Sequence, residues 1–330
     1  PDHSSLSRIR QRIDLETHQE VFCWVLKRVT EQGLLRGKTL GIDATTLEAN
    51  AAMRSIVRRD TGEGYQEFLE GLARASGITT PTREDLAKLD RSRKNKASND
   101  DWYNPHDPDA RIAQMKDGRT HLAHKAEQAV DMETGAIVAV TVQGADQGDT
   151  TTLWNTLAES VENLGQVEGD PATAGWMEGK VIQEVVADKG YHSNDSLLGF
   201  EERGMRPQIS EPDRGRRCWE DKAEAKRAVY ANRRRVRSQR GKQLQRQRGE
   251  KLERSNAHLY ETGGMRRTHL RGHPNILKRL IVHAAGFNLG LLMRAQFGIG
   301  KPRTLQDAGK ALRAALCACL GRWIRRLTLP

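Results

Sequence analysis

The sequence lacks long apolar runs, and it has few aromatic residues (5%) and only four cysteines among its 330 residues. No apolar stretch reaches the roughly 18 residues that a membrane-spanning helix needs, and no charged and then apolar leader opens the chain. We therefore expect neither a membrane span nor a secretory signal. The cysteines lack the paired spacing of zinc sites and are expected to be reduced, structural thiols. These absences favour a cytoplasmic protein.

Acidic residues are fewer than basic ones, 43 against 54, which gives the chain a net charge of +11. The excess is concentrated in residues 214–254, which hold sixteen basic residues against five acids. Interspersed Ala, Leu and Gln favour helix there, and a helix that only has to be soluble would mix both signs. We expect this segment to contact a nucleic-acid backbone; the alternatives are a solvated helix face or flexible sequence.

Two segments predict strands that end near an acid. Val181–Ser193 contains an apolar run rich in Val and Ile that ends in Asp188, and Lys38–Asn50 alternates around Asp43. Open α/β sheets bind ligands at the carboxyl ends of such strands, so each acid is a candidate metal ligand or proton carrier. The alternative for Asp188 is that it only caps the turn that follows.

The order of elements predicts an α/β fold with a mixed, five-stranded sheet flanked by helices. Residues 121–131 and 135–144 form a predicted hairpin, a helix follows over 149–163, and a short strand over 205–210 comes after the Asp188 strand. A strand that is reached through a helical crossover can lie parallel to the first strand. That arrangement would place Asp43 and Asp188 side by side.

The remaining segments predict helices and insertions. We divide the chain into a helical N-terminal segment, a sheet domain with two insertions, and a C-terminal helix: 1–36, 37–297 with insertions at about 51–117 and 211–249, and 298–330. Within the first insertion, 65–72 and 83–89 predict helices, and Asp100–Asp109 predicts a solvated loop. Ile276–Phe297 predicts a long apolar helix packed on the sheet.

Two aspartates at neighbouring strand ends, with a basic segment nearby, suggest a magnesium site for phosphodiester chemistry. Hard divalent cations bind carboxylate oxygens, and two such ions can activate an attacking oxygen and stabilise a leaving one. A third carboxylate is expected from the helix over 250–260, where Glu250 and Glu253 share one face.

Several motifs in this order resemble bacterial insertion-sequence transposases of the DDE type, which have an RNase-H-like fold. The matching stretches are Gly41-Ile42-Asp43-Ala44-Thr45, Val186-Ala187-Asp188-Lys189-Gly190-Tyr191, Glu253–Tyr260, Gly264–Gly272 and Asn288-Leu289. The resemblance covers most of residues 40–292. It implies that Asp43, Asp188 and Glu253 bind two Mg²⁺ or Mn²⁺ ions, which promote hydrolysis at the ends of the element and strand transfer to target DNA.

The third acid is the weakest part of the resemblance. Such transposases carry a Tyr, an Arg, the catalytic Glu and a Lys at fixed spacing, but Gly249 and Tyr260 stand at the Arg and Lys positions around Glu253. Glu250 has Arg246 at the Arg spacing and lacks the other residues of that pattern. We prefer Glu253 and keep Glu250 as its rival.

By the resemblance, the partners are the terminal inverted repeats of the element and target DNA, bound by a homodimer or larger assembly in the bacterial cytoplasm at the nucleoid. The residues expected to hold DNA are Lys189, Arg233, Arg234, Arg235, Arg237, Arg266 and Arg267. His192 would position its loop or contact DNA, and ordinary surface charge is an equal alternative for Lys189, Arg266 and Arg267.

The chain begins at Pro1 without an initiator Met, so we expect the family's N-terminal end-binding region to be missing in part. Two alternatives to a transposase therefore stay open. One is a truncated, non-catalytic remnant that binds DNA through its basic segment, and the other is an RNase-H-like nuclease without strand transfer.

Overall fold

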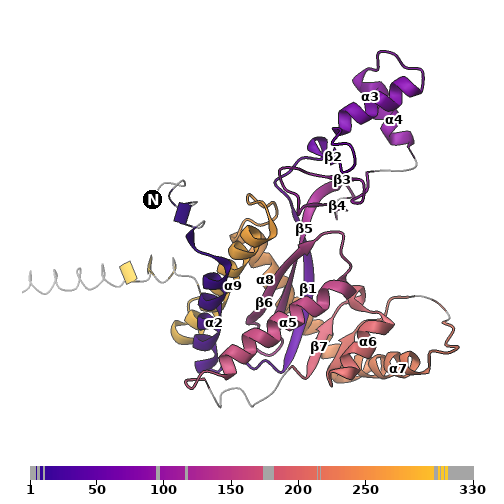
Figure 1. Cartoon of the computed structure of the whole chain (residues 1–330). Helices are drawn as coiled ribbons and strands as arrows, with labels where there is room; N and C mark the ends of the chain where they lie inside the picture. The colour runs from indigo at the N-terminus through magenta and orange to yellow at the C-terminus, as the bar shows by residue number, and fades with distance from the viewer. Residues whose placement is uncertain are drawn as a thin grey trace, which may run out of the picture.

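A computed structural model describes residues 12–300 apart from 94–96, 116–117, 174–181, 214 and 216, together with scattered residues near both ends. Within this part, a mixed sheet is flanked by helices, and a smaller lobe projects beyond one end of the sheet (Figure 1). The strands of the main sheet are β1 (Thr39–Glu48), β4 (Arg111–Gln114), β5 (Thr120–Asp131), β6 (Ile137–Gly144), β7 (Glu184–Ala187) and β8 (Arg206–Ile209).

The sheet has antiparallel and parallel halves. β5 pairs antiparallel with β4, β6 and β1, while β7 and β8 continue from β1 in parallel. The helices α5 (Asp149–Glu168) and α6 (Asn194–Glu202) make the two crossovers that parallel strands require. This confirms the predicted mixed α/β architecture of the RNase-H-like type. The sheet has six strands instead of five, because β4 is too short to show a periodic pattern in the sequence.

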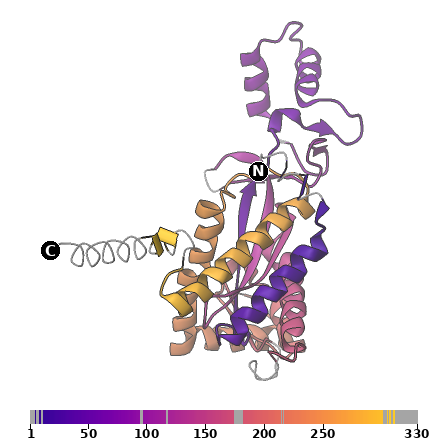
Figure 2. The ribbon, with the colours of Figure 1, turned by 90° about the vertical axis from the view of Figure 1, so that its left-hand side faces the viewer.

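The core lies between the sheet and the helices α2 (Leu15–Glu31), α5 and α9 (His273–Phe297). Side chains alternate along β1, so Leu40 and Ile42 point into this core while Gly41 and Asp43 point to the other face. α2 and α9 lie side by side across the fold (Figure 2). α2 lies within the helical N-terminal segment predicted over 1–36, and most of residues 1–11 lie outside the described residues.

α9 is the long apolar helix that the sequence predicts. The side-chain amide of Asn288 bonds the backbone N–H and C=O of Ile137 on β6, at 2.8 Å each. Its length and hydropathy would allow it to cross a membrane. However, Ile276, Leu280 and Ala284 are fully buried in the core, so packing against the sheet accounts for the apolar composition of the helix.

The smaller lobe holds η1 (Met53–Ser55), β2 (Val57–Arg58), α3 (Tyr65–Ala75), α4 (Arg83–Ser92) and β3 (Trp102–Tyr103). Its centre is Trp102, whose ring meets the edges of Tyr65 and Phe68 with centroids 5.0 and 5.2 Å apart. Both helices predicted for this region are confirmed by α3 and α4.

The expectation of a solvated loop over Asp100–Asp109 is wrong for Asn104 and Asp107, which are fully buried. Asp107 Oδ2 lies 3.0 Å from Nε2 of His124 on β5, and Asp107 Oδ1 accepts the backbone N–H of Gly272 at 3.1 Å. The loop therefore ties the smaller lobe to the sheet and to the start of α9.

The basic segment forms two helices, α7 (Ala223–Arg237) and α8 (Gln239–Ala257), as the sequence predicts. They meet at Ser238, whose hydroxyl caps α8 by accepting the N–H of Gly241 at 3.0 Å. α8 then crosses β8, β7 and β1 and continues into a single π-helical turn, η3 (His258–Thr262). The C-terminal helix predicted after residue 305 lies outside the described residues.

Candidate active site

Asp43 and Asp188 lie level with each other on adjacent parallel strands. β1 and β7 pair Thr39 with Glu184 and Gly41 with Val186, and the same register continued by two residues aligns Asp43 with Asp188. Residues at matching positions of neighbouring strands point to the same face. Both acids therefore face α8, Asp43 from the middle of β1 and Asp188 from the residue that follows β7. The predicted adjacency of the two strands is confirmed. The expectation that Asp43 lies near the end of its strand is wrong, because β1 continues to Glu48.

Asp43 is held by two side chains from α8. Arg248 Nη1 lies 3.4 Å from Asp43 Oδ1, and Asn256 Nδ2 donates to Asp43 Oδ2 at 3.0 Å. Asn256 is fixed in turn because its Oδ1 accepts from Gln128 on β5 at 2.7 Å. The Asp43 side chain is still 24% exposed, so its carboxylate remains accessible from solvent.

Asp188 ends β7 and caps η2 (Lys189–Tyr191), which is the simpler of the two roles that its position suggested. Its Oδ1 accepts the N–H of Gly190 at 2.8 Å. A Cβ at Gly190 would stand 3.1 Å from that oxygen and 2.3 Å from Asp149 Oδ2, so the absence of a side chain lets two carboxylates approach the turn. Asp149 is ion-paired with Lys125 on β5 at 2.5 Å, whereas Asp188 is half-buried and open on one side.

A buried glutamate supports this turn from the other face of the sheet. Glu127 accepts hydrogen bonds from the hydroxyls of Tyr191 and Thr152, both at 2.8 Å, and from that of Thr156. Burial raises the pKa of Glu127, and the three hydroxyl donors only partly oppose that rise. Burial, followed by the charges of Glu127, Asp149 and Asp43, raises the pKa of Tyr191, so Tyr191 stays a neutral donor.

The third carboxylate expected on α8 does not lie close enough to Asp43 and Asp188 to form a metal-binding group with them. Glu250 and Glu253 are both exposed, and within the described part of the chain no three Asp, Glu, His or Cys side chains form a group that could hold a metal ion. At about 100° per helical residue, Glu253 lies roughly 60° around α8 from Asn256, whereas Glu250 lies roughly 120° from it. Glu253 is therefore on the flank nearer Asp43.

Tyr260 stands at the position where the related motif has a Lys. Its hydroxyl donates to the backbone carbonyl of Thr46 at 3.2 Å. Burial and the charge of Asp43 raise its pKa, so it remains a neutral phenol beside the strand end. No cation stands at this position, and the nearest counterpart of such a charge near Asp43 is Arg248.

The four arginines predicted to bind DNA on α7 differ in their surroundings. Arg234 and Arg237 are exposed. Arg233 forms an ion pair with Glu211 at 2.8 Å, and Arg235 Nε donates to the carbonyl of Pro207 at 3.1 Å. Arg233 and Arg235 therefore also help to hold α7 against β8 and the segment that follows β8.

The other predicted DNA contacts surround the carboxyl ends of β1 and β7. Lys189 is exposed beside Asp188, whereas His192 is buried, which leaves it the role of positioning the turn. Arg266 is ion-paired with Glu261, and Arg267 Nε lies 3.7 Å from Glu48.

Reasoning from the sequence missed Glu127, Asp149 and Arg248 as neighbours of the two aspartates. The sequence gives no clear signal for Glu127, because β5 also carries Lys125, Gln128 and Asp131, and the burial of the strand is visible only in the fold. Asp149 and Arg248 gave no clear signal either, since exposed acids at helix starts and arginines in a basic helix are both common.

Comparison with known families found a matching family model. A family model described as the transposase DDE domain matches residues 77–289, which is more than half of the chain. The match includes Asp188 and both candidate glutamates of α8, and it begins after Asp43. No curated protein and no solved structure matched the chain.

Proposed function

The chain belongs to the transposase DDE-domain family of the insertion-sequence type, and from that membership we propose that it cleaves DNA at the ends of an element and joins them to target DNA. Asp43, Asp188 and Glu253 are its metal-binding carboxylates. The observation that carries the proposal is the register that places Asp43 beside Asp188 on one face of the sheet.

The family generally uses divalent metal ions, and the two aspartates form a donor set that fits Mg²⁺ or Mn²⁺. Asp43 and Asp188 offer carboxylate oxygens from two neighbouring backbones, and both side chains are partly exposed. A bound divalent ion polarises a phosphodiester and lowers the pKa of an attacking water or 3′-hydroxyl. Glu253 completes the set when its side chain turns toward Asp43.

The protein's own residues hold the two aspartate side chains in place. Asn256 donates to Asp43 Oδ2, Arg248 lies beside Asp43 Oδ1, and the N–H of Gly190 fixes Asp188 Oδ1. These donors orient the two carboxylates, whose oxygens are the ligand type that a hard cation binds. Arg248 also provides positive charge next to the scissile phosphate.

DNA is the partner that membership in the family implies. We propose that the exposed Arg234, Arg237 and Lys189 contact its backbone, and that two or more copies of the chain act together on the terminal repeats. Lys189 lies beside Asp188, whereas Arg234 and Arg237 lie on α7. Location at the bacterial nucleoid is part of the same proposal.

One observation favours a second candidate function, a DNA-binding protein without catalysis. The acids of the proposed triad do not converge among the described residues, and Asp43 is already engaged by Arg248 and Asn256. In that case the carboxylates would serve only to hold α8 on the sheet.

The test is a nicking and joining assay on a duplex that carries the element's ends, with Mg²⁺ or Mn²⁺. We expect Asp188→Asn to lower the nicking rate by more than about 100-fold, because a metal ligand contributes several kcal/mol to transition-state stabilisation. The matched control is Asp195→Asn, the same change at an exposed position of α6. Nicking that is equal in both variants would refute the catalytic assignment, and nicking without joining would indicate a nuclease.

A further inference from the structure

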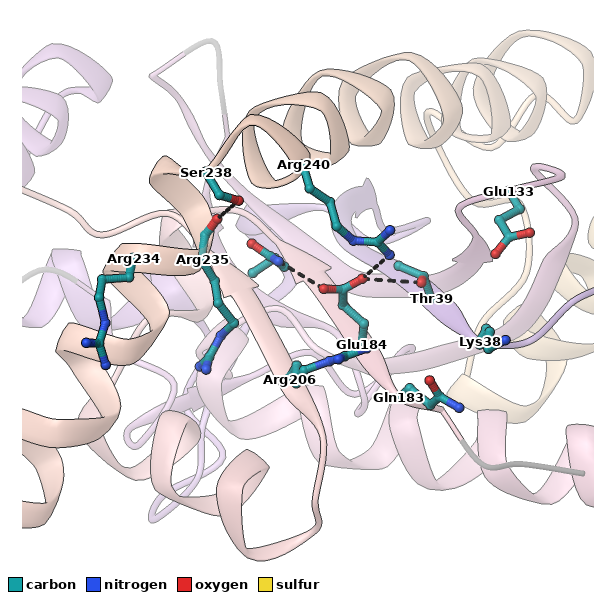
Figure 3. A pocket seen from close by; sticks show the side chains of 11 residues that line it. Lys38, Thr39, Glu133, Gln183, Glu184, Arg206, Arg234, Arg235, Ser238 and Arg240 are labelled. Carbon is teal, nitrogen blue, oxygen red and sulfur yellow. Dashed lines mark hydrogen bonds and ion pairs between the residues drawn. The ribbon is translucent and has the colours of Figure 1, made fainter.

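A cavity of about 750 Å³ opens at the end of the sheet opposite to the two aspartates. It lies at the starts of β7 and β8, beside the junction where α7 turns into α8 (Figure 3). We call it the arginine pocket and define it by Lys38, Glu184, Arg206, Arg234, Arg235 and Arg240. None of these six residues belongs to the proposed metal site.

The arginine pocket carries more positive than negative charge. Its basic lining residues are Lys38, Arg206, Arg234, Arg235 and Arg240, and its acidic ones are Glu133 and Glu184. Glu184 is only 3% exposed and is neutralised by Arg240, whose Nη2 lies 2.7 Å from Glu184 Oε2. Figure 3 shows Arg240 reaching Glu184 on one side of the cavity, with Arg234 and Arg235 on the other. Among the described residues, Arg206, Arg234 and Arg235 form no ion pair with a carboxylate, so their charges are available to a ligand.

Arg235 holds a donor for which the described residues provide no acceptor. Its Nε bonds the carbonyl of Pro207, which fixes the guanidinium, while its buried Nη2 has no hydrogen-bond partner among the described residues. Burial lowers the pKa of Arg235, which is the expected effect of withdrawing a charge from water. An unsatisfied buried donor costs free energy that an anionic ligand or a water would recover.

We propose that the arginine pocket binds a phosphate of the DNA backbone, with Arg206, Arg234 and Arg235 as its ligands. Arginine suits this role because its planar fork bonds two phosphate oxygens at once. The inference rests on the proposed function, which supplies DNA as the partner, and it adds a second point of contact remote from the chemistry.

The spacing between the two points agrees with one bound DNA segment. Glu184, at the pocket, and Asp188 are four residues apart on the same strand, which corresponds to roughly 13 Å at about 3.3 Å per residue. Successive phosphates of one DNA strand advance about 3.4 Å along the helix axis. One helical turn of DNA is about 34 Å long, so a single duplex is long enough to reach both points.

The experiment measures how the affinity for a fixed DNA duplex depends on salt, in an Asp188→Asn background that prevents cleavage. The logarithm of the binding constant falls with the logarithm of salt concentration by about 0.9 for each contacted phosphate. We expect Arg206→Gln with Arg234→Gln to reduce that slope by about one or more. The control removes the same charge from the exposed start of α7, through Lys222→Gln with Lys226→Gln, and should change the slope less.

The loss of a DNA contact can be distinguished from an effect on folding or on catalysis. Arg206 and Arg234 are exposed, so their replacement leaves the core intact, and Arg235→Lys tests the fixed fork with its charge kept. An unchanged slope in the Arg206/Arg234 variant, or an equal change in the control, would overturn the pocket assignment while normal nicking by the unaltered protein still supported the proposed function. A reduced slope in a chain that never nicks would support the pocket alone.

Discussion

The two ends of the sheet face beneath α8 carry the same kind of acid in opposite surroundings. In the middle of β1 and just after β7, Asp43 and Asp188 are partly exposed, and Arg248 lies beside Asp43. At the other end, Glu184 is buried and paired with Arg240, and further arginines surround it. One end is therefore suited to a cation, and the other to an anion.

Two buried glutamates show what produces this contrast. Glu127, 1% exposed, receives only hydroxyl donors, so burial dominates and its pKa is raised. Glu184 is about as buried, but the hydrogen bonds from Arg240 and Gln208 outweigh burial and lower its pKa. The nature of the donors, more than the depth of burial, decides which charge each site tolerates.

The largest expected effect tests whether α8 supplies the third carboxylate of the proposed metal site. Glu253→Gln should lower metal-dependent nicking by more than about 100-fold if Glu253 supplies the third carboxylate. Glu250→Gln, the same change one helical turn earlier, should leave nicking within a few-fold of the unaltered protein. A strong loss in the Glu250 variant alone would exchange the two roles.

The next effect concerns the α7–α8 junction that shapes the arginine pocket. A Cβ at Gly241 would stand 2.1 Å from the carbonyl oxygen of Arg235 and 2.8 Å from the Cα of Val236. Gly241→Ala should therefore lower the free energy of unfolding by about 1–3 kcal/mol, because backbone atoms must move. Unfolding in urea measures this loss.

Gly249→Ala, on the same helix, is the matched control. A Cβ there would meet only Glu253 Oε1, at 4.0 Å, so the gain in helix propensity should stabilise the protein by about 0.5–1 kcal/mol. If both variants changed stability in the same direction, close packing at Gly241 would not be what the junction requires.

A smaller effect is expected from removing Arg240, the partner of Glu184 in the arginine pocket. The folded pKa of Glu184 lies below its ordinary value of 4.5, so its ionised form stabilises the fold above that pH and the stabilisation is lost as pH falls through the folded pKa. Arg240→Gln should remove about 1 kcal/mol at neutral pH, a modest value because the Arg240 side chain is 65% exposed.

With its pKa raised by that substitution, Glu184 should also take up its proton at a higher pH. Urea unfolding of the Arg240→Gln variant should then show acid destabilisation that begins at a higher pH than in the unaltered protein. Lys242→Gln, which removes a charge from an exposed position two residues away on α8, is the control and should leave the pH profile unchanged.

The smallest effect has the opposite sign and belongs to Glu127. Its folded pKa lies above 4.5, so the folded state retains a proton that the unfolded state has released, and stability falls as pH rises from 4.5 through the folded pKa. Glu127→Gln should flatten that fall. A variant that loses stability above pH 4.5 as steeply as the unaltered protein would assign the pH dependence to another group.

Local pattern predicted much of the fold. The valine-rich run before Asp188 and the alternation around Asp43 indicated β7 and β1, and the helical periodicity of 65–72 and 83–89 indicated α3 and α4. β4 was not predicted, because a strand of four residues is too short to show a periodic pattern of apolar residues. The burial of Asp107 was not predicted either, because one of its hydrogen-bond partners, Gly272, is 165 residues away in the sequence.

The candidate site divides in the same way. The sequence placed two acids on or just after strands and offered two glutamates on one helix, since both follow from spacing along the chain. Which flank of α8 faces Asp43 could not be predicted, because it depends on how the helix docks across three strands. The support of Tyr191 by Glu127 joins residues 64 positions apart.

By itself, then, the sequence determined most of the strands and helices, the presence of Asp43 on β1 and Asp188 after β7, and the excess of positive charge in α7 and α8. Only the tertiary structure decided which acidic side chains are paired with a cation and which remain accessible. Such pairs join distant segments, as Arg240 and Glu184 do across 56 residues of sequence. Charge is a property of composition, whereas neutralisation requires two groups to be brought within a few ångströms of each other.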